Sequence, residues 1–151
     1  MRIVYPSERI PKNKKSIFLA GTISSDRKND WRQLVISKLE KAGYNGIVLN
    51  PDYTDIAEDQ RNTYEDQILW EINAIKTSTA TMFWIDRDLK TRPGLTTNVE
   101  FGYWLNTDKI FYGRPDTSEK CFYLDYIYKL QGFSNPANNL DDLVNITLKN
   151  M

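Results

Sequence analysis

The stretch that decides the fold is ATMFWIDRDLKTRPGLTTNVEFGYW, from Ala80 to Trp104. It opens with a continuous apolar run, Met82 to Ile85, of the kind that forms a strand buried on both faces. A polar loop broken by Pro93-Gly94 follows, and Thr96-Thr97-Asn98 then stands in front of a predicted helix. The expected order is strand, loop, helix. In open α/β sheets, ligands bind at this kind of junction, where a parallel strand ends.

The predicted helix carries apolar residues at three-to-four spacing, which describes a buried stripe. The stripe consists of Val99, Phe101, Trp104 and Leu105. We expect Glu100 in the first turn of this helix, and its carboxylate would then lie beside the ligand crevice.

The composition excludes several kinds of site. The chain has 151 residues, 20 basic and 20 acidic, and 40% of it is hydrophobic, which predicts a single domain over residues 1–151. Zero net charge gives no electrostatic reason to expect a nucleic-acid partner. With no histidine in the sequence, a Ser-His-Asp triad, a Cys-His pair and a histidine-based metal site are impossible.

The single cysteine, Cys121, leaves no disulfide framework and fits a reducing compartment. No segment resembles a signal peptide or a membrane span. We therefore expect a cytoplasmic protein that uses no membrane partner, no metal and no cofactor.

The remaining chain alternates strand and helix patterns. Expected strands are residues 16–21, 47–49 and 109–112, while residues 2–5 are read as an edge strand or an ordered arm. Expected helices run from a cap at Asn29 or Asp30 to Ala42, from Thr63 to about Thr77, over residues 118–131, and from a cap at Asn138 or Asn139. Their inward faces are predicted as Trp31, Leu34, Val35 and Leu39; Ile68, Leu69, Ile72 and Ile75; Tyr123, Ile127 and Leu130; and Leu140, Leu143, Val144 and Leu148.

This βαβ order predicts an α/β fold: a doubly wound, flavodoxin- or Rossmann-like parallel sheet of four to five strands with helices on both faces. The polar segment 55–62 is long enough to act as a lid.

Three strand ends deliver polar or flexible residues to one edge of this sheet. They are Gly21-Thr22, Asn50-Pro51-Asp52, and the loop that leads to Asn98 and Glu100. Gly21 either lets a ligand approach the backbone or only makes the turn. Because the sequence has no histidine, a general acid, a general base or a nucleophile would have to be Glu, Asp, Tyr, Lys, Ser or Thr.

Two glutamates interrupt apolar surroundings: Glu71 follows Trp70, and Glu100 stands between Val99 and Phe101. Enzymes that cleave glycosidic bonds usually use a pair of carboxyl groups. Alternatively, Glu100 completes a capping box with the threonine three residues earlier, and Glu71 is a surface residue paired with a nearby cation.

Aromatic side chains offer surfaces on which a nucleobase can stack. Most aromatic residues in such a chain belong to the core, so each candidate is either a ligand contact or a core residue. The candidates are Phe18, Trp84, Tyr103 and Trp104.

Taken together, the segments IFLAGTI, VLNP, QILWE, PGLTTNVEFGYW and GRP resemble the nucleoside 2-deoxyribosyltransferase family, and most closely its smaller 2-deoxyribosyltransferase-like branch. The resemblance runs from Ile17 to about Pro115. It implies that Glu100, in VEFG, is the nucleophile that forms a covalent deoxyribosyl intermediate. It also implies that Glu71 is the carboxyl group that exchanges a proton with the base.

Two positions depart from the family pattern. Phe18 stands where relatives often have a tyrosine, and Gly94 stands where they have an acidic residue six positions before the nucleophile. Asn98 or Asp86 is a candidate to replace the hydrogen bonding of that acid to the sugar. These departures also support a non-catalytic module that binds or senses nucleotides.

Relatives act on 2′-deoxynucleosides or on their 5′-monophosphates, so the resemblance implies a small-molecule nucleoside or nucleotide as partner. The base is either transferred to another base or released by hydrolysis, and the sequence leaves both open. Relatives commonly complete the sugar site with a neighbouring subunit, so we expect a homo-oligomer. Phosphoryl transfer is poorly supported because no GxxxxGK[ST] segment is present. Candidate phosphate ligands are Gly21, Thr22, Ser24, Ser25 and Arg114, although Ser and Thr in turns equally satisfy backbone groups.

Overall fold

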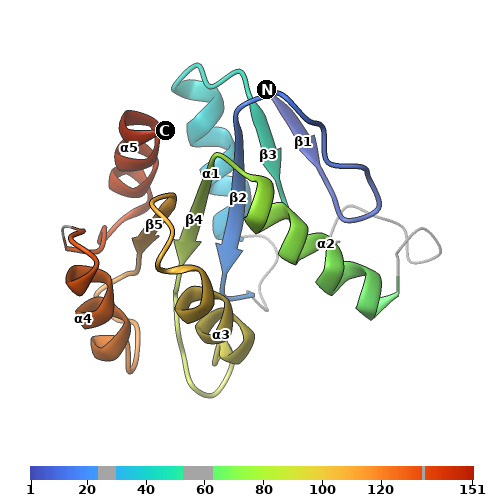
Figure 1. Cartoon of the computed structure of the whole chain (residues 1–151). Helices are drawn as coiled ribbons and strands as arrows, with labels where there is room; N and C mark the ends of the chain where they lie inside the picture. Colours follow the sequence, from blue (N-terminus) through green and yellow to red (C-terminus); the bar gives the residue numbers. More distant parts are fainter. Residues whose placement is uncertain (24–29, 53–62, 134) are drawn as a thin grey trace.

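The computed structural model describes residues 1–23, 30–52, 63–133 and 135–151. Over these residues the chain forms one parallel sheet in the order β1-β3-β2-β4-β5, with helices on both faces (Figure 1). The strands are β1 (Arg2–Val4), β2 (Ser16–Gly21), β3 (Ile47–Leu49), β4 (Ala80–Trp84) and β5 (Ile110–Gly113). The helices are α1 (Trp31–Lys41), α2 (Tyr64–Thr77), α3 (Leu95–Trp104), α4 (Phe122–Leu130) and α5 (Leu140–Asn150). The predicted doubly wound α/β fold is confirmed.

The N-terminal segment is an edge strand rather than an ordered arm. β1 pairs in parallel with β3, which in turn pairs with β2. From β2 the chain steps to β3 on one side, and then returns to β4 on the other. This reversal leaves a crevice at the carboxyl ends of the strands, which is where such sheets bind ligands.

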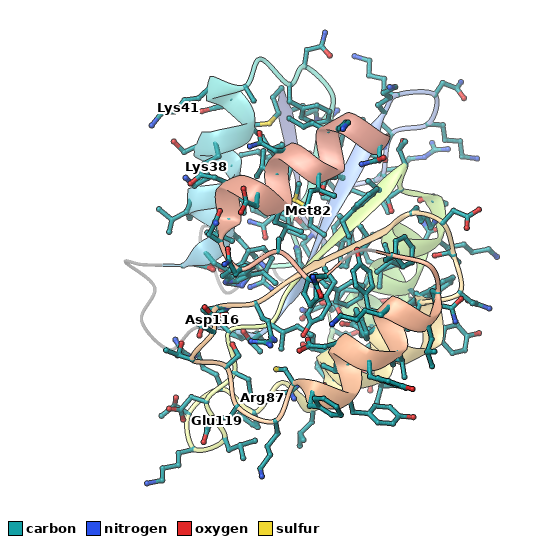
Figure 2. All side chains as sticks on the ribbon, turned by 90° about the vertical axis from the view of Figure 1, so that its left-hand side faces the viewer. Lys38, Lys41, Met82, Arg87, Asp116 and Glu119 are labelled. Atoms are coloured by element: carbon teal, nitrogen blue, oxygen red, sulfur yellow. The ribbon has the colours of Figure 1, made fainter. Side chains whose placement is uncertain are left out.

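Two apolar clusters hold the layers together, one on each face of the sheet. One cluster packs α2, α3 and α4 against the sheet and includes Phe18 and Phe101. The other packs α1 and α5 and includes Met82 and Trp84. Met82 appears in Figure 2, in the view that also shows Lys38 and Lys41 on α1. Lys38 Nζ also bonds Asp141 Oδ1 at 2.6 Å, which links α1 to α5 at the surface.

Local capping explains where several helices begin. Asp30 accepts a hydrogen bond from the Arg32 amide, Thr63 from the Asp66 amide, and Asn139 from the Asp142 amide. The predicted starts of α1, α2 and α5 are therefore confirmed, with Asp30 and Asn139 as the caps.

The start of α3 differs from the prediction. The helix begins at Leu95 after Gly94, which has φ +61° and makes no side-chain cap. Thr97 is already inside the helix and buried, so the capping box with Glu100 does not form. Glu100 lies in the second turn rather than the first. An added Cβ at Gly94 would lie 2.8 Å from Thr22 Cγ2, so glycine is required both for the backbone angle and for the close approach.

Several predicted inward faces are wrong because the sheet contacts a different side of each helix. Leu34, Ile68, Leu69, Ile72, Val99, Tyr123 and Leu130 are all exposed. On α1, three of the four predicted positions, Trp31, Val35 and Leu39, are buried, and Arg32 and Ile36 are buried beside them. On α2, Ile75 is buried as predicted, together with Trp70 and Ala74. On α4 the buried residues are Leu124 and Tyr128.

The candidate lid over residues 55–62 lies outside the described residues. Among the helices that the structure describes, none is both long and apolar enough to cross a membrane.

Candidate functional site

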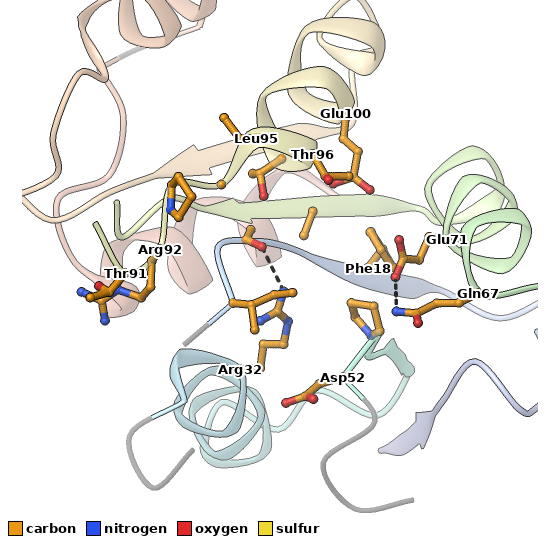
Figure 3. A pocket seen from close by; sticks show the side chains of 17 residues that line it. Phe18, Arg32, Asp52, Gln67, Glu71, Thr91, Arg92, Leu95, Thr96 and Glu100 are labelled. Atoms are coloured by element: carbon orange, nitrogen blue, oxygen red, sulfur yellow. Dashed lines mark hydrogen bonds between the residues drawn. The ribbon is translucent and has the colours of Figure 1, made fainter. Parts of the chain in front are cut away.

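A cavity of about 560 Å³ opens at the carboxyl edge of the sheet, between α2 and α3 (Figure 3). Its size is within the range usual for small-molecule sites. Its walls come from β2, the start of α1, the residues after β3, one side of α2, the loop before α3 and the first turns of α3. The lining residues include Phe18, Gly21, Asp52, Gln67, Glu71, Arg92, Gly94, Thr96 and Glu100.

The two glutamates reach this cavity from neighbouring helices. Glu71 projects from α2 and Glu100 from α3, with both carboxylates directed into the same space (Figure 3). Gln67, one turn before Glu71, donates from Nε2 to Glu71 Oε1 at 2.8 Å. This bond fixes the Glu71 carboxylate and leaves its second oxygen available to a ligand.

Burial makes both carboxyl groups weaker acids than usual. Burial, reinforced by the negative charge of Glu71 and partly opposed by the positive charge of Arg32, raises the pKa of Glu100 to about 7. Burial also raises the pKa of Glu71, although the Gln67 hydrogen bond and Arg32 oppose the shift. Because each negative charge disfavours the other, one carboxyl group tends to keep a proton while the other ionises. The pair is therefore able to supply one nucleophile and one acid.

Phe18 forms part of the cavity wall between the glutamates and the sheet. Only 1% of the residue is exposed, and its ring lies 6.2 Å from that of Trp70. Trp70 is held in turn by a hydrogen bond from its indole Nε1 to the Glu8 carbonyl, 3.0 Å long. Phe18 is thus a rigid apolar surface with no polar group to offer a ligand.

Asp52 lines the opposite side of the cavity and hydrogen-bonds the Asp30 side chain. Burial and this contact raise the pKa of Asp30. Asn50 lies beneath this turn, where its Oδ1 accepts from the Asp52 amide at 3.1 Å. Asn50 therefore shapes the wall without lining the cavity.

Three further predicted contacts do not line the cavity: Thr22, Asp86 and Asn98. Each makes a hydrogen bond or an ion pair with a neighbouring residue. Thr22 Oγ1 donates to the Asp86 carbonyl at 3.1 Å. Asp86 Oδ2 pairs at 3.3 Å with Nη1 of Arg92, which does line the cavity. Asn98 Oδ1 accepts from Nη2 of the buried Arg87 and so anchors the start of α3.

Trp84, a predicted ligand contact, does not line the cavity. Its side chain belongs to the cluster beneath α1 and α5, on the other face of the sheet. Of the residues singled out from the sequence, those that line the cavity are Phe18, Gly21, Asp52, Glu71, Gly94 and Glu100.

Of the described phosphate candidates, Gly21 lines the cavity but Arg114 does not. Arg114 bonds both carboxylate oxygens of Asp125, at 2.7 to 3.2 Å, and is not among the cavity residues. Ser24 and Ser25 lie outside the described residues.

Sequence reasoning missed Arg32, a cavity residue that is only 4% exposed. The spacing of Arg32 from the apolar residues of α1 could have identified it as buried. Val35, Ile36 and Leu39 follow Arg32 by three, four and seven residues, which puts a charged residue on the buried stripe of α1.

Comparison with known proteins supports the resemblance seen in the motifs. A family model described as nucleoside 2-deoxyribosyltransferase like matches residues 14–116, about two thirds of the chain. The matched segment contains Glu71 and Glu100 and ends just after β5. A comparison with curated proteins found no match.

Proposed function

The chain belongs to the nucleoside 2-deoxyribosyltransferase-like family, and we propose that it cleaves the N-glycosidic bond of 2′-deoxynucleosides or their 5′-monophosphates and transfers the deoxyribosyl group to another base. The observation that carries this proposal is the pair of half-buried carboxyl groups, Glu71 and Glu100, in one cavity. Such a pair matches the needs of a reaction that uses one carboxylate and one carboxylic acid.

In the proposed reaction, the Glu100 carboxylate attacks C1′ of the sugar and forms an ester bond to it. The bond from C1′ to the base nitrogen breaks, and its electron pair stays with the base. Glu71 supplies the proton that this nitrogen, or a conjugated atom of the base, takes up. A second base then attacks C1′, returns a proton to Glu71, and releases the Glu100 carboxylate.

The walls of the cavity give further support. Gly21 and Gly94 line the cavity with backbone atoms alone. Phe18 offers an apolar wall near Glu71, as a planar base would require. Thr96 and Asp52 offer polar groups for sugar hydroxyls.

The test is chromatography of the bases and nucleosides formed from a panel of 2′-deoxynucleosides and 5′-monophosphates, each with and without an acceptor base. New nucleoside formed only with acceptor establishes transfer, whereas free base formed without acceptor establishes hydrolysis. The Glu100→Ala variant serves as the inactive control. Nucleotide binding by calorimetry without any turnover would replace this proposal with a sensing module.

The rate of base release should depend on pH through Glu100. Because the nucleophile must be ionised and burial raises the pKa of Glu100 to about 7, the rate is expected to rise with pH through about 7. Below the midpoint it should fall about tenfold for each pH unit. The measurement is kcat/KM between pH 5 and 9, with circular dichroism at each pH to show that the protein stays folded. A profile with its acid limb near pH 4.5 would contradict a buried nucleophile.

We also propose that the chain forms a homo-oligomer through an apolar surface next to the cavity. Leu95, Val99 and Tyr103 follow one another at four-residue intervals on α3, and each is more than 70% exposed. Leu95 also lines the cavity, so the surface and the site are continuous. Monomeric proteins rarely leave such a patch uncovered, and a second copy is the partner that a symmetric assembly supplies.

The substitution Val99→Glu should dissociate this assembly, because it would place a charge in the centre of the surface. Sedimentation or light scattering at micromolar concentration should show a smaller species than the unsubstituted chain. Lys41→Glu, an exposed change on α1, should leave the assembly unchanged. The proposal would be contradicted if the unsubstituted chain were already monomeric at high concentration.

A further inference from the structure

The cavity contains a buried positive charge that the proposed reaction does not yet use. Arg32 lies in its wall, between Asp52 and the two glutamates in the view of Figure 3. Its side chain is only 5% exposed. A buried charge is costly unless it is well hydrogen-bonded, so its retention here requires an explanation.

Backbone carbonyl groups, rather than a carboxylate, hold this guanidinium in place. Nε donates to the Leu19 carbonyl at 3.3 Å, Nη1 to Thr22 at 3.3 Å, and Nη2 to Gly21 at 3.2 Å. The Trp31 ring packs against it, with its centroid 4.5 Å from Cζ. These groups fix the position of the charge without neutralising it.

Arg114 provides a useful contrast. Its guanidinium makes short contacts with both oxygens of one carboxylate, Asp125, which neutralises its charge locally. Arg32 pairs through Nη1 with Asp30 Oδ1, and this contact is longer, at 3.8 Å. Burial raises the pKa of Asp30, so this partner is a poorer anion than usual. The charge of Arg32 therefore remains available to the cavity.

Four carboxyl groups surround that charge, each from a different part of the chain. Asp30 precedes α1, Asp52 follows β3, Glu71 is on α2 and Glu100 is on α3. Among the cavity residues that the structure describes, the other cation is Arg92, which is already paired with Asp86. Several buried carboxyl groups cannot all ionise near one another unless a cation compensates them.

We propose that Arg32 is a positioning residue for the reaction: its guanidinium, fixed by the carbonyls at the end of β2 in the cavity that Glu100 also lines, compensates the negative charge of Glu100 when this carboxyl group ionises to attack the sugar. This inference rests on the proposed function, in which Glu100 is the nucleophile. The electrostatics agree with it, because the charge of Arg32 lowers the pKa of Glu100 and of Glu71 against the effect of burial. Arginine suits this role better than lysine because its planar group can donate to several carbonyls at once and keeps its charge when buried.

The direct test is the titration of Glu100, followed by the ¹³C shift of its carboxyl carbon in the unsubstituted chain and in Arg32→Gln. Removing the charge should move the midpoint upward from about 7 by on the order of one pH unit. Base release at pH 6.5 should then fall about tenfold in kcat, with a smaller change in KM, and recover as the pH rises. Arg32→Lys, which keeps a charge, should shift the midpoint less.

Arg114→Gln is the matched control, because it removes a half-buried arginine outside the cavity. It should lower the melting temperature without moving the Glu100 midpoint or the pH profile. A folded Arg32→Gln variant whose midpoint equals that of the unsubstituted chain would overturn the inference, and would leave Arg32 with a purely structural role.

If Arg32→Gln does not fold, the unsubstituted protein still gives an answer. The ¹⁵N resonances of the Arg32 guanidinium should shift with the same midpoint as Glu100, since the two charges interact. No such shift would overturn the inference. Failure of the proposed function is a separate outcome: the unsubstituted chain would release no base from any substrate in the panel, whatever the titration shows.

Discussion

Replacing Glu100 by glutamine is expected to lower base release by at least about 10³-fold, because the amide cannot attack the sugar carbon. The loss should appear in kcat, while substrate affinity measured by calorimetry changes little. Single-turnover chromatography with a deoxynucleoside or its 5′-monophosphate measures the effect. Glu40→Gln, an exposed change on α1, should retain full activity.

The same substitution should stabilise the fold, which separates a catalytic effect from misfolding. Because burial raises the pKa of Glu100 from 4.5 to about 7, the folded protein binds more protons than the unfolded chain between these values. Stability is therefore lost as the pH rises through that window, and the glutamine variant avoids the loss. The variant should melt at a higher temperature than the unsubstituted chain at pH 8. Near-normal turnover by Glu100→Gln would rule out Glu100 as the nucleophile.

Replacing Glu71 by glutamine is expected to lower base release by about 10²- to 10⁴-fold, the usual contribution of a general acid. The size of the loss should depend on the base, because a base that leaves easily needs less help from a proton. Rates for a good and a poor leaving base, measured with Glu71→Gln and the unsubstituted chain, test this dependence. Glu65→Gln, at the exposed start of the same helix, is the control.

Glu71→Gln should also change the pH profile in a defined direction. The negative charge of Glu71 is one cause of the raised pKa of Glu100, so its removal should move the Glu100 midpoint below about 7. The shift is opposite in sign to that expected for Arg32→Gln. Equal losses for all bases, with an unmoved acid limb, would show that Glu71 does not serve as the acid.

The order of strands and helices was predictable from the chain itself. Apolar runs such as that from Met82 to Ile85 describe buried strands, and caps such as Asp30, Thr63 and Asn139 set helix starts through local hydrogen bonds. These are short-range effects. The motif around Glu100 was likewise recognisable, because its residues are contiguous in the sequence.

Which face of each helix is buried was decided by the tertiary structure. Val99 and Leu69 fit an apolar stripe, yet both are exposed, because the sheet lies against other sides of α3 and α2. Periodicity defines a stripe around a helix axis but not its rotation relative to neighbouring elements. In α3, the helix begins at Leu95, directly after Gly94, and so earlier than predicted. Glu100 therefore lies in the second turn of the helix rather than in the first.

The chemical character of the site likewise depends on contacts between distant segments. The sequence by itself determined the fold class, the family motifs and the presence of two glutamates in apolar surroundings. Only the tertiary structure brought Arg32 from α1 to the carbonyls at the end of β2, and placed Glu71 and Glu100 in one cavity. The pKa of a buried carboxyl group is set by burial and by charges across the cavity, and these are fixed by packing between elements that are far apart in the chain.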